Sequence, residues 1–349
     1  MDEFLTKVLG PSRKYLNRRT VFLAILLALL LCAYLTFQLY KYFGRECTKK
    51  EILMGTVVEV SVFSSHAERH ADAAISLMRR LSAKLDWRNG KSEVAIINNM
   101  AGIAKVAVSH DTFDIISRPL KLSRSLGGVF DITVGPLVDL WRMSGGIPPS
   151  PEAVGAAKTL VGWVDVDLDP DAETVMLKRR GMRLNLDGVG KGYIVARARE
   201  LLVSRGVKSA MISTGSSIAV IGNRPGGGAW RVGIRDPRKQ GEIIGILELE
   251  AGESLSTSGD YERYFEYDGK RYHDILDPRT SYPAEGCQSV TIIAPDATVA
   301  DILSTAVFIM GPALGLRYIE NMSGIKGVIV TSSGALIKSS GVKLEEVKK

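Results

Sequence analysis

The stretch VADILSTAVFIM, residues 299–310, decides how this chain is organised. It is apolar apart from Asp301 and two hydroxyl side chains, and it predicts a helix. Residues four apart lie on one helical face, so Asp301 and Thr305 share a face. Their carboxylate and hydroxyl are hard oxygen ligands of the kind that Mg²⁺ takes. A carboxylate placed favourably in the helix dipole, and a threonine bonded back to a carbonyl, would explain the same pair.

The rest of the chain predicts one compact α+β body, because strand and helix patterns alternate without repeats or low-complexity tracts. Apolar spacing predicts further helices at 67–85, 112–126, 191–204 and 312–321. Short alternating or β-branched runs predict strands at 56–63, 208–213, 217–222, 229–234, 243–249, 254–258, 263–267, 288–294, 327–331 and 336–338.

The net charge of +7 is concentrated at the N-terminus. Residues 1–50 carry nine lysines and arginines against three acids, so the remaining body is close to neutral. A near-neutral body lacks the general basic footprint of a nucleic-acid-binding protein, and we expect no nucleic-acid partner.

Residues 21–40 carry no formal charge and match the roughly 20 residues that a membrane-spanning helix needs. We expect a basic cytoplasmic segment at 1–20, a transmembrane signal anchor at 21–40 and a tether at 41–50. A folded domain at 51–349 would then lie on the periplasmic or extracytoplasmic side of the inner membrane. A cleaved signal peptide is the alternative. Cys47 and Cys287 could form a disulfide in an oxidising compartment.

Three further segments gather glycine, acid and hydroxyl residues. GGVFDITVGPL at 127–137 places Asp131 between glycines, either at a ligand or in a turn that satisfies the carboxylate. NLDGVGKGY at 185–193 precedes a helix, where free N–H groups favour anions, although many helices begin after glycine. STSGDY at 256–261 is followed by YHDILDPRT at 272–280, in which His273 and Asp274 are candidate proton-transfer groups. Neighbours in a strand face opposite sides, so we expect only one of the two to serve a site.

The order of these motifs resembles the ApbE family of FAD:protein FMN transferases, over about residues 51–340. The motifs that carry the resemblance are MGT at 54–56, Ser92-Glu93 with Asn98, FDITVGPL at 130–137 with Trp141, Gly188 with KGY at 191–193, WRVGI at 230–234 with Asp236-Pro237, TSGDY at 257–261, DPRT at 277–280, and Ala300-Asp301 with Thr305-Ala306.

The resemblance implies a single catalytic domain of ApbE type, T-fold-like, with mixed or antiparallel sheets and packed helices. It implies that FAD binds as a substrate, that Mg²⁺ bridges its diphosphate, and that FMN passes to a Thr or Ser hydroxyl while AMP leaves. The partner would be an exported acceptor flavoprotein of a membrane redox complex. The metal would be held by Asp301, Thr305 and the carbonyl of Gly188. The FAD site would be lined by Met54, Trp87, Val129, Phe130, Asp131, Asn185, Lys191 and Ile275.

The chain departs from the family pattern near the reacting groups. Asp274 occupies the usual histidine position, directly after His273, and Asp187 and Ser216 stand where glycines are common. Ser281 replaces the glycine after Arg279-Thr280. A carboxylate can act as a general base, so we expect Asp274 to replace the histidine. The departures leave two alternatives open, a FAD diphosphatase that releases FMN and AMP, and a non-catalytic flavin-binding assembly protein.

Overall fold

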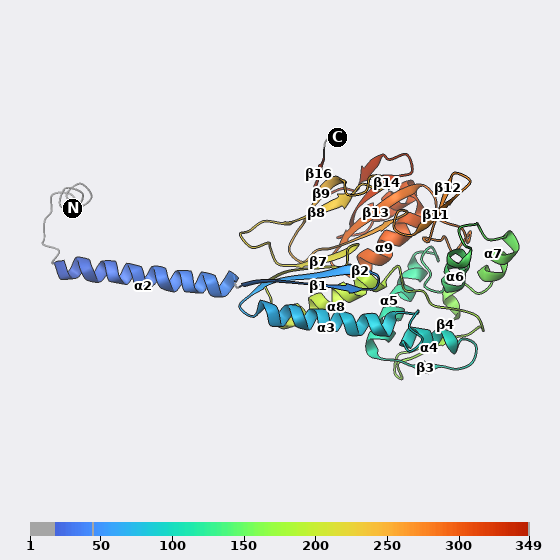
Figure 1. Ribbon diagram of the computed structural model, residues 1–349, viewed down its shortest axis with the longest axis horizontal. Helices are drawn as coiled ribbons and strands as arrows, with labels where there is room; N and C mark the ends of the chain where they lie inside the picture. The colour runs from blue at the N-terminus through green and yellow to red at the C-terminus, as the bar shows by residue number, and fades with distance from the viewer. Residues whose placement is uncertain (1–17, 44, 348–349) are drawn as a thin grey trace.

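The computed structural model describes residues 18–43 and 45–347. Helix α2 (Arg18–Phe43) extends away from the folded body (Figure 1). Its segment Thr20–Phe37 is long and apolar enough to cross a membrane, and none of it is buried against the body. Most of the expected basic segment at 1–20 lies outside the described residues.

The expected tether at 41–50 is wrong. Helix α2 runs to Phe43, and strand β1 (Arg45–Leu53) pairs antiparallel with β2 (Thr56–Ser64) along its whole length. The strand was missed because its sequence, RECTKKEIL, is charged. Charged residues are typical of an edge strand, where they discourage pairing with other chains, and β1 lies at the edge of the central sheet.

The core of the body is an eight-stranded sheet in the order β1-β2-β6-β7-β10-β13-β14-β15, and every neighbouring pair is antiparallel. The central strands β7 and β13 are buried along their full length, because both faces of the sheet are covered. Besides β1 and β2, the strands of this sheet are β6 (Ser209–Ser213), β7 (Ser217–Ile221), β10 (Ser254–Gly259), β13 (Cys287–Ala294), β14 (Lys326–Thr331) and β15 (Leu336–Lys338).

Helices cover one face of this sheet and a small sheet covers the other (Figure 1). The helical layer consists of α3 (Ala67–Leu85), α8 (Gly190–Ser204), α9 (Ala297–Met310) and α10 (Pro312–Glu320). The opposite face buries Ile218, Leu255 and Ile293 beneath the small sheet. That sheet consists of β8 (Trp230–Arg235), β9 (Ile243–Leu249) and β16 (Leu344–Glu346). The expected mixed α and β fold with antiparallel sheets is confirmed.

The segments between α3 and α8, and between β10 and β13, contain the remaining elements, and apart from α5 and β11 the sequence patterns did not predict them. These are α4 (Glu93–Asn99), β3 (Val106–Ala107), α5 (His110–Ser125), α6 (Gly135–Met143), α7 (Pro151–Lys158), a 3₁₀ turn (Trp163–Asp165), β4 (Val166–Asp169), β5 (Thr174–Leu177), β11 (Tyr264–Tyr267) and β12 (Lys270–His273). Helices α4, α6 and α7 are too short to show a clear apolar period. Cys47 and Cys287 are free thiols, so the disulfide that we considered is not formed.

Candidate active site

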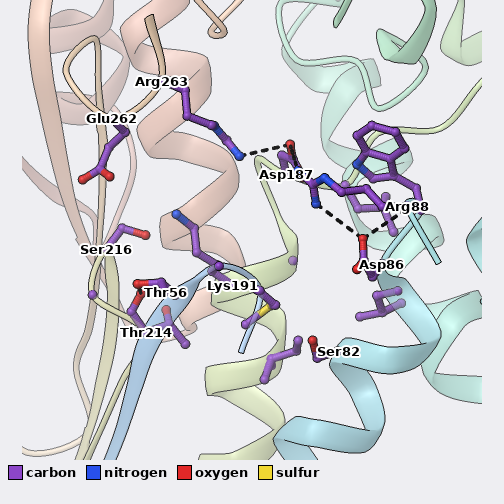
Figure 2. Close-up of a pocket in the computed structure, with 18 of the residues that line it drawn as sticks. Thr56, Ser82, Asp86, Arg88, Asp187, Lys191, Thr214, Ser216, Glu262 and Arg263 are labelled. Atoms are coloured by element: carbon purple, nitrogen blue, oxygen red, sulfur yellow. Dashed lines mark hydrogen bonds and ion pairs between the residues drawn. The ribbon is translucent and has the colours of Figure 1, made fainter. Parts of the chain in front are cut away.

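Two adjoining cavities lie where the starts of α8 and β11 approach each other. The first has a volume of about 270 Å³ and extends to the β1–β2 turn and the end of α3 (Figure 2). The second, of about 100 Å³, lies between the glycine-rich loop before α8, the helix α9 and the segment after β12. Four side chains line both cavities: Asp187, Lys191, Glu262 and Arg263. A ligand longer than either cavity could therefore lie across this junction.

Asp301 and Thr305 line the second cavity from α9. The Asp301 carboxylate is buried, and it accepts hydrogen bonds from the Gly192 N–H at 2.8 Å and from the Ser256 hydroxyl at 2.8 Å. The Thr305 hydroxyl shares a hydrogen bond of 3.0 Å with Ser258. Burial raises the pKa of Asp301, against the opposing effects of the Lys191 charge and the Gly192 N–H. The pair therefore faces a cavity and is not confined to a role within its own helix.

The backbone of Gly188 lies beside Thr305 and lines the same cavity as Asp301. A Cβ added to Gly188 would lie 3.3 Å from the Thr305 hydroxyl and 3.1 Å from the Phe130 ring. The three expected metal ligands are thus together at one cavity, and their carboxylate, hydroxyl and carbonyl oxygens suit a hard cation. The two carboxylate oxygens of Asp301 have acceptor capacity beyond the hydrogen bonds from Gly192 and Ser256. Within 18–43 and 45–347 there is no cluster of three or more His, Cys, Asp or Glu side chains for a metal. A cation here would depend on the hydroxyl and carbonyl oxygens.

The expected FAD-site residues divide between the two cavities. Met54 and Trp87 line the first, whereas Phe130, Asp131, Asn185 and Ile275 line the second, and Lys191 lines both. The Lys191 side chain points into the middle of the first cavity (Figure 2). Val129 lines neither cavity and is a buried core residue.

The Asp131 carboxylate accepts most of its hydrogen bonds from its own loop. Its carboxylate accepts hydrogen bonds from the N–H and the hydroxyl of Thr133, both at 2.7 Å, and from the N–H of Trp163 at 3.0 Å. Burial raises the pKa of Asp131, although these hydrogen bonds oppose the effect. The turn that we considered as an alternative is therefore present, and Asp131 holds the cavity wall in shape.

His273 is the last residue of β12 and Asp274 directly follows the strand, and their side chains have different surroundings. The His273 ring is buried, with Nε2 at 3.0 Å from the Ala284 carbonyl and Nδ1 at 3.3 Å from the Ile275 N–H. Its edge also contacts the Phe308 ring. Asp274, in contrast, lines the second cavity. Both nitrogens of His273 are used by the backbone, so the geometry favours Asp274 as the proton acceptor.

The environment of His273 predicts a pH-dependent stability. Burial lowers the pKa of His273, so its ring stays neutral in the folded chain while the unfolded chain takes up a proton near pH 6.5. We expect this residue to destabilise the fold as the pH falls below 6.5, by at most about 1.4 kcal/mol per pH unit. Urea unfolding at pH 7, 6 and 5 would measure it against His273→Gln, which keeps a donor for Ala284. Equal pH dependence in both proteins would contradict the prediction.

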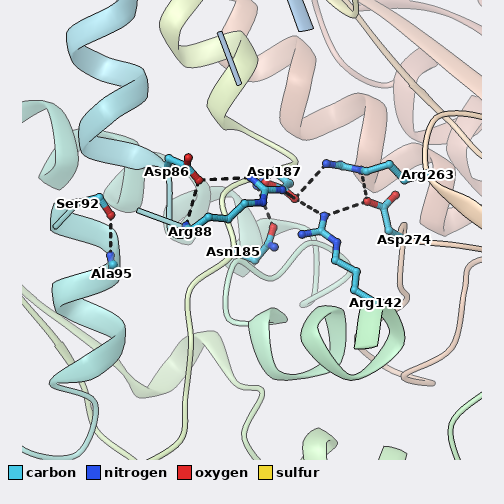
Figure 3. Close-up of polar contacts among 9 residues, drawn as sticks. All are labelled: Asp86, Arg88, Ser92, Ala95, Arg142, Asn185, Asp187, Arg263 and Asp274. Atoms are coloured by element: carbon cyan, nitrogen blue, oxygen red, sulfur yellow. Dashed lines mark hydrogen bonds and ion pairs between the residues drawn. The ribbon is translucent and has the colours of Figure 1, made fainter. Parts of the chain in front are cut away.

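An ion cluster at the junction was not predicted (Figure 3). Arg142 of α6 contacts Asp187 at 2.5 Å and Asp274 at 3.2 Å. Arg263 contacts Asp274 at 2.5 Å and Asp187 at 3.3 Å. Arg88 lies 3.8 Å from Asp187. Burial alone would raise the pKa of Asp187, but the Arg263 and Arg142 charges outweigh it and hold the pKa below its usual range.

Two residues of this cluster lie beside motifs that were recognised. Arg142 directly follows Trp141, and Arg263 comes two residues after Tyr261. Both follow family motifs, but no spacing in the sequence indicates that they meet Asp187 and Asp274. Their partners come from different parts of the chain, so only the folded arrangement reveals the cluster.

Comparison with known proteins identifies related chains and a related fold. Residues 54–329 match the ApbE family. A FAD:protein FMN transferase of Klebsiella pneumoniae (strain 342) is 34% identical over 305 residues, which is 86% of this chain and 94% of the relative. One of Treponema pallidum (strain Nichols) is 31% identical over 318 residues, 85% and 88% of the two chains. The crystal structure of the ApbE protein of Thermotoga maritima superposes with a TM-score of 0.79 at 35% identity, covering 85% of this chain and 97% of that one.

The family match spans most of the folded body, and both the relatives and the solved structure align over nearly their whole lengths; the chain belongs to the ApbE family.

Proposed function

We propose that this protein transfers FMN from FAD to a Thr or Ser hydroxyl of an acceptor flavoprotein and releases AMP, in a reaction that depends on Mg²⁺. The observation that carries the proposal is that Asp301, Thr305 and Gly188 meet at one cavity, and that Lys191 lines both this cavity and the adjoining one. The names of the relatives in the ApbE family support the same reaction.

The two cavities suit a long anionic substrate. Lys191 makes no ion pair among the described side chains, and it stands at the junction, where a diphosphate between the two halves of FAD would lie. A bound Mg²⁺ at Asp301, Thr305 and Gly188 would neutralise charge on the diphosphate.

We assign the role of general base to Asp274. In the reaction, the acceptor hydroxyl gives its proton to the Asp274 carboxylate, and its oxygen forms a bond to the phosphorus of the FMN half. The bond from that phosphorus to the bridging oxygen breaks, and AMP leaves with the bridging oxygen. Asp274 lines the second cavity together with Asp301 and Thr305, so one cavity holds both the proton acceptor and the expected metal ligands.

We also propose that α2 anchors the protein in the cytoplasmic membrane by a single pass, with the catalytic domain on the extracytoplasmic side. The apolar segment Thr20–Phe37 and the basic residues before it support this orientation. An exported flavoprotein subunit of a membrane redox complex is the acceptor class that such an anchor would bring close. Cleavage of the segment would be detected by N-terminal sequencing of the mature protein.

The reaction is tested with the full chain in detergent micelles, supplied with FAD, Mg²⁺ and an acceptor flavoprotein. We expect mass spectrometry to find FMN on an acceptor Thr or Ser, with AMP released in equal amount. Asp274→Asn should lower the transfer rate by about 10²- to 10⁴-fold, because it removes the proton acceptor. Asp268→Asn, at the exposed tip of the same hairpin, is the matched control and should keep the wild-type rate.

The products separate the alternatives. Release of FMN and AMP without a modified acceptor would show that the protein is a FAD diphosphatase and not a transferase. FAD binding with no product at all would support a non-catalytic flavin-binding protein. An unchanged rate in Asp274→Asn would show that another group takes the proton.

A further inference from the structure

The ion cluster at the junction ties together the two acids that depart from the family pattern. Arg142 and Arg263 each contact both Asp187 and Asp274, so two guanidinium groups and two carboxylates form one closed network (Figure 3). Both guanidinium groups contact the same oxygen of Asp274, Oδ2. The network therefore joins α6, the loop before α8 and the β11–β12 hairpin at the point where the cavities meet.

The two arginines differ in their freedom to move. The Arg142 side chain is 24% exposed and lines only the second cavity, whereas the Arg263 side chain is 48% exposed and lines both. Arg263 stands directly before β11, and Asp274 directly after β12, joined by a backbone hydrogen bond of 3.2 Å. Arg263 can thus leave Asp274 by side-chain rotation alone, without a change in the hairpin.

The ligand that would compete for Arg263 is a diphosphate. A guanidinium group forms paired hydrogen bonds with phosphate oxygens as readily as with a carboxylate. A diphosphate at the junction would lie beside Lys191, and Arg263 borders the same space. The carboxylates of Asp187 and Asp274 would repel the phosphates unless positive groups remain between them.

We propose that Arg263 is a positioning residue that exchanges partners: it is held by Asp274 and Asp187 in the free protein, and the diphosphate of FAD draws it away. Asp274 then keeps only Arg142, which leaves its carboxylate more accessible to the acceptor hydroxyl. The proposal rests on the proposed function, because it takes FAD as the ligand. It makes FAD binding and the availability of the base a single coupled event.

Equilibrium binding tests this exchange without any turnover. FAD affinity is measured by quenching of flavin fluorescence, without acceptor, for the full-length wild type, Asp274→Asn, Arg263→Met and the double variant. Asp274→Asn weakens the hold on Arg263, so we expect it to bind FAD more tightly. The four proteins form a double-mutant cycle. The loss of one negative charge changes FAD affinity equally with and without Arg263, so this effect cancels in the cycle. We expect the effect of Asp274→Asn on FAD affinity to differ about fivefold between the proteins with and without Arg263.

Controls separate the exchange from other effects. Riboflavin, which has no phosphate, should show no coupling in the same cycle. Arg231→Met removes a comparable exposed arginine, paired with Glu345 on the small sheet, and should leave FAD affinity unchanged. Arg263→Gln provides a second variant if Arg263→Met does not fold, and the thermal midpoint of each variant is recorded.

The outcomes distinguish the two proposals. If Asp274→Asn changes FAD affinity by the same factor with and without Arg263, or if riboflavin shows equal coupling, the exchange is overturned while the transferase proposal stands. If the wild type binds no FAD, with or without Mg²⁺, the proposed function fails and the exchange fails with it. Coupling confined to FAD supports the exchange even where no acceptor is modified.

Discussion

Replacing Asp301 by Asn is expected to abolish flavin transfer while the chain stays folded. The carboxylate is the only formal charge in α9 and the only anionic group among the three expected metal ligands. An amide would lose that charge and with it much of the affinity for a hard cation. We expect the transfer rate to fall by at least about 10²-fold, in line with the loss of several kcal/mol of charge stabilisation.

The fold should tolerate this change because the amide can satisfy the same neighbours. Its oxygen can accept the Gly192 N–H, and its NH₂ group can donate to the Ser256 hydroxyl, which also contacts Ser217 at 2.9 Å. The change also removes a buried charge, whose cost raises the pKa of Asp301 in the native chain. We therefore expect a thermal midpoint equal to or above that of the wild type.

The measurement is a titration of transfer rate against Mg²⁺ concentration for both proteins. Asp296→Asn, at the N-cap of the same helix, is the matched control, since its side chain accepts the Thr298 N–H and Asn caps helices as well as Asp does. If Asp301→Asn kept the wild-type rate and the wild-type dependence on Mg²⁺, Asp301 would not be a metal ligand.

Among the substitutions considered, Gly192→Ala is expected to cause the largest decrease in the free energy of unfolding. Gly192 lies in the first turn of α8, where the helix meets the start of α9. An added Cβ would overlap the Ala297 carbonyl oxygen and lie 2.5 Å from the Asp301 Cβ. Neither neighbour can rotate away, because one is backbone and the other is attached directly to it. We expect a destabilisation of about 3 kcal/mol, the upper end of the usual range for overpacking.

Gly190→Ala provides the control for this effect. Gly190 belongs to the same helix start, but a Cβ there would meet nothing within 4 Å. Urea unfolding of the two variants and the wild type would compare the free energies of unfolding, and only Gly192→Ala should be strongly shifted. Because Gly192 also donates its N–H to Asp301, the variant should bind FAD with Mg²⁺ more weakly. Equal stabilities of the two variants would mean that the close packing of α8 and α9 does not require this glycine.

The elements that were predicted best are those whose patterns are local. Helix α3 begins and ends at the predicted residues, Ala67–Leu85, because its buried side chains recur at helical spacing. Strand β2 was recognised from its alternation. Strand β1 was missed because its charged sequence becomes a strand only by pairing with β2. Strand β12 was missed for a similar reason, since its short sequence KRYH pairs with β11 across a two-residue turn.

The candidate site divides in the same way. Helical periodicity alone placed Asp301 and Thr305 on one face, and strand alternation alone separated His273 from Asp274. Both follow from backbone geometry within a few residues of sequence. The sequence by itself therefore determined the α+β class, the apolar N-terminal segment and which side chains share a face.

Only the tertiary structure decided which faces meet. It brought Gly188 against Thr305, placed Ser256 on Asp301, and joined Asp187 and Asp274 through Arg142 and Arg263. These contacts join residues far apart in the chain. They depend on how the helices and the hairpin pack on the central sheet, which local sequence patterns do not encode.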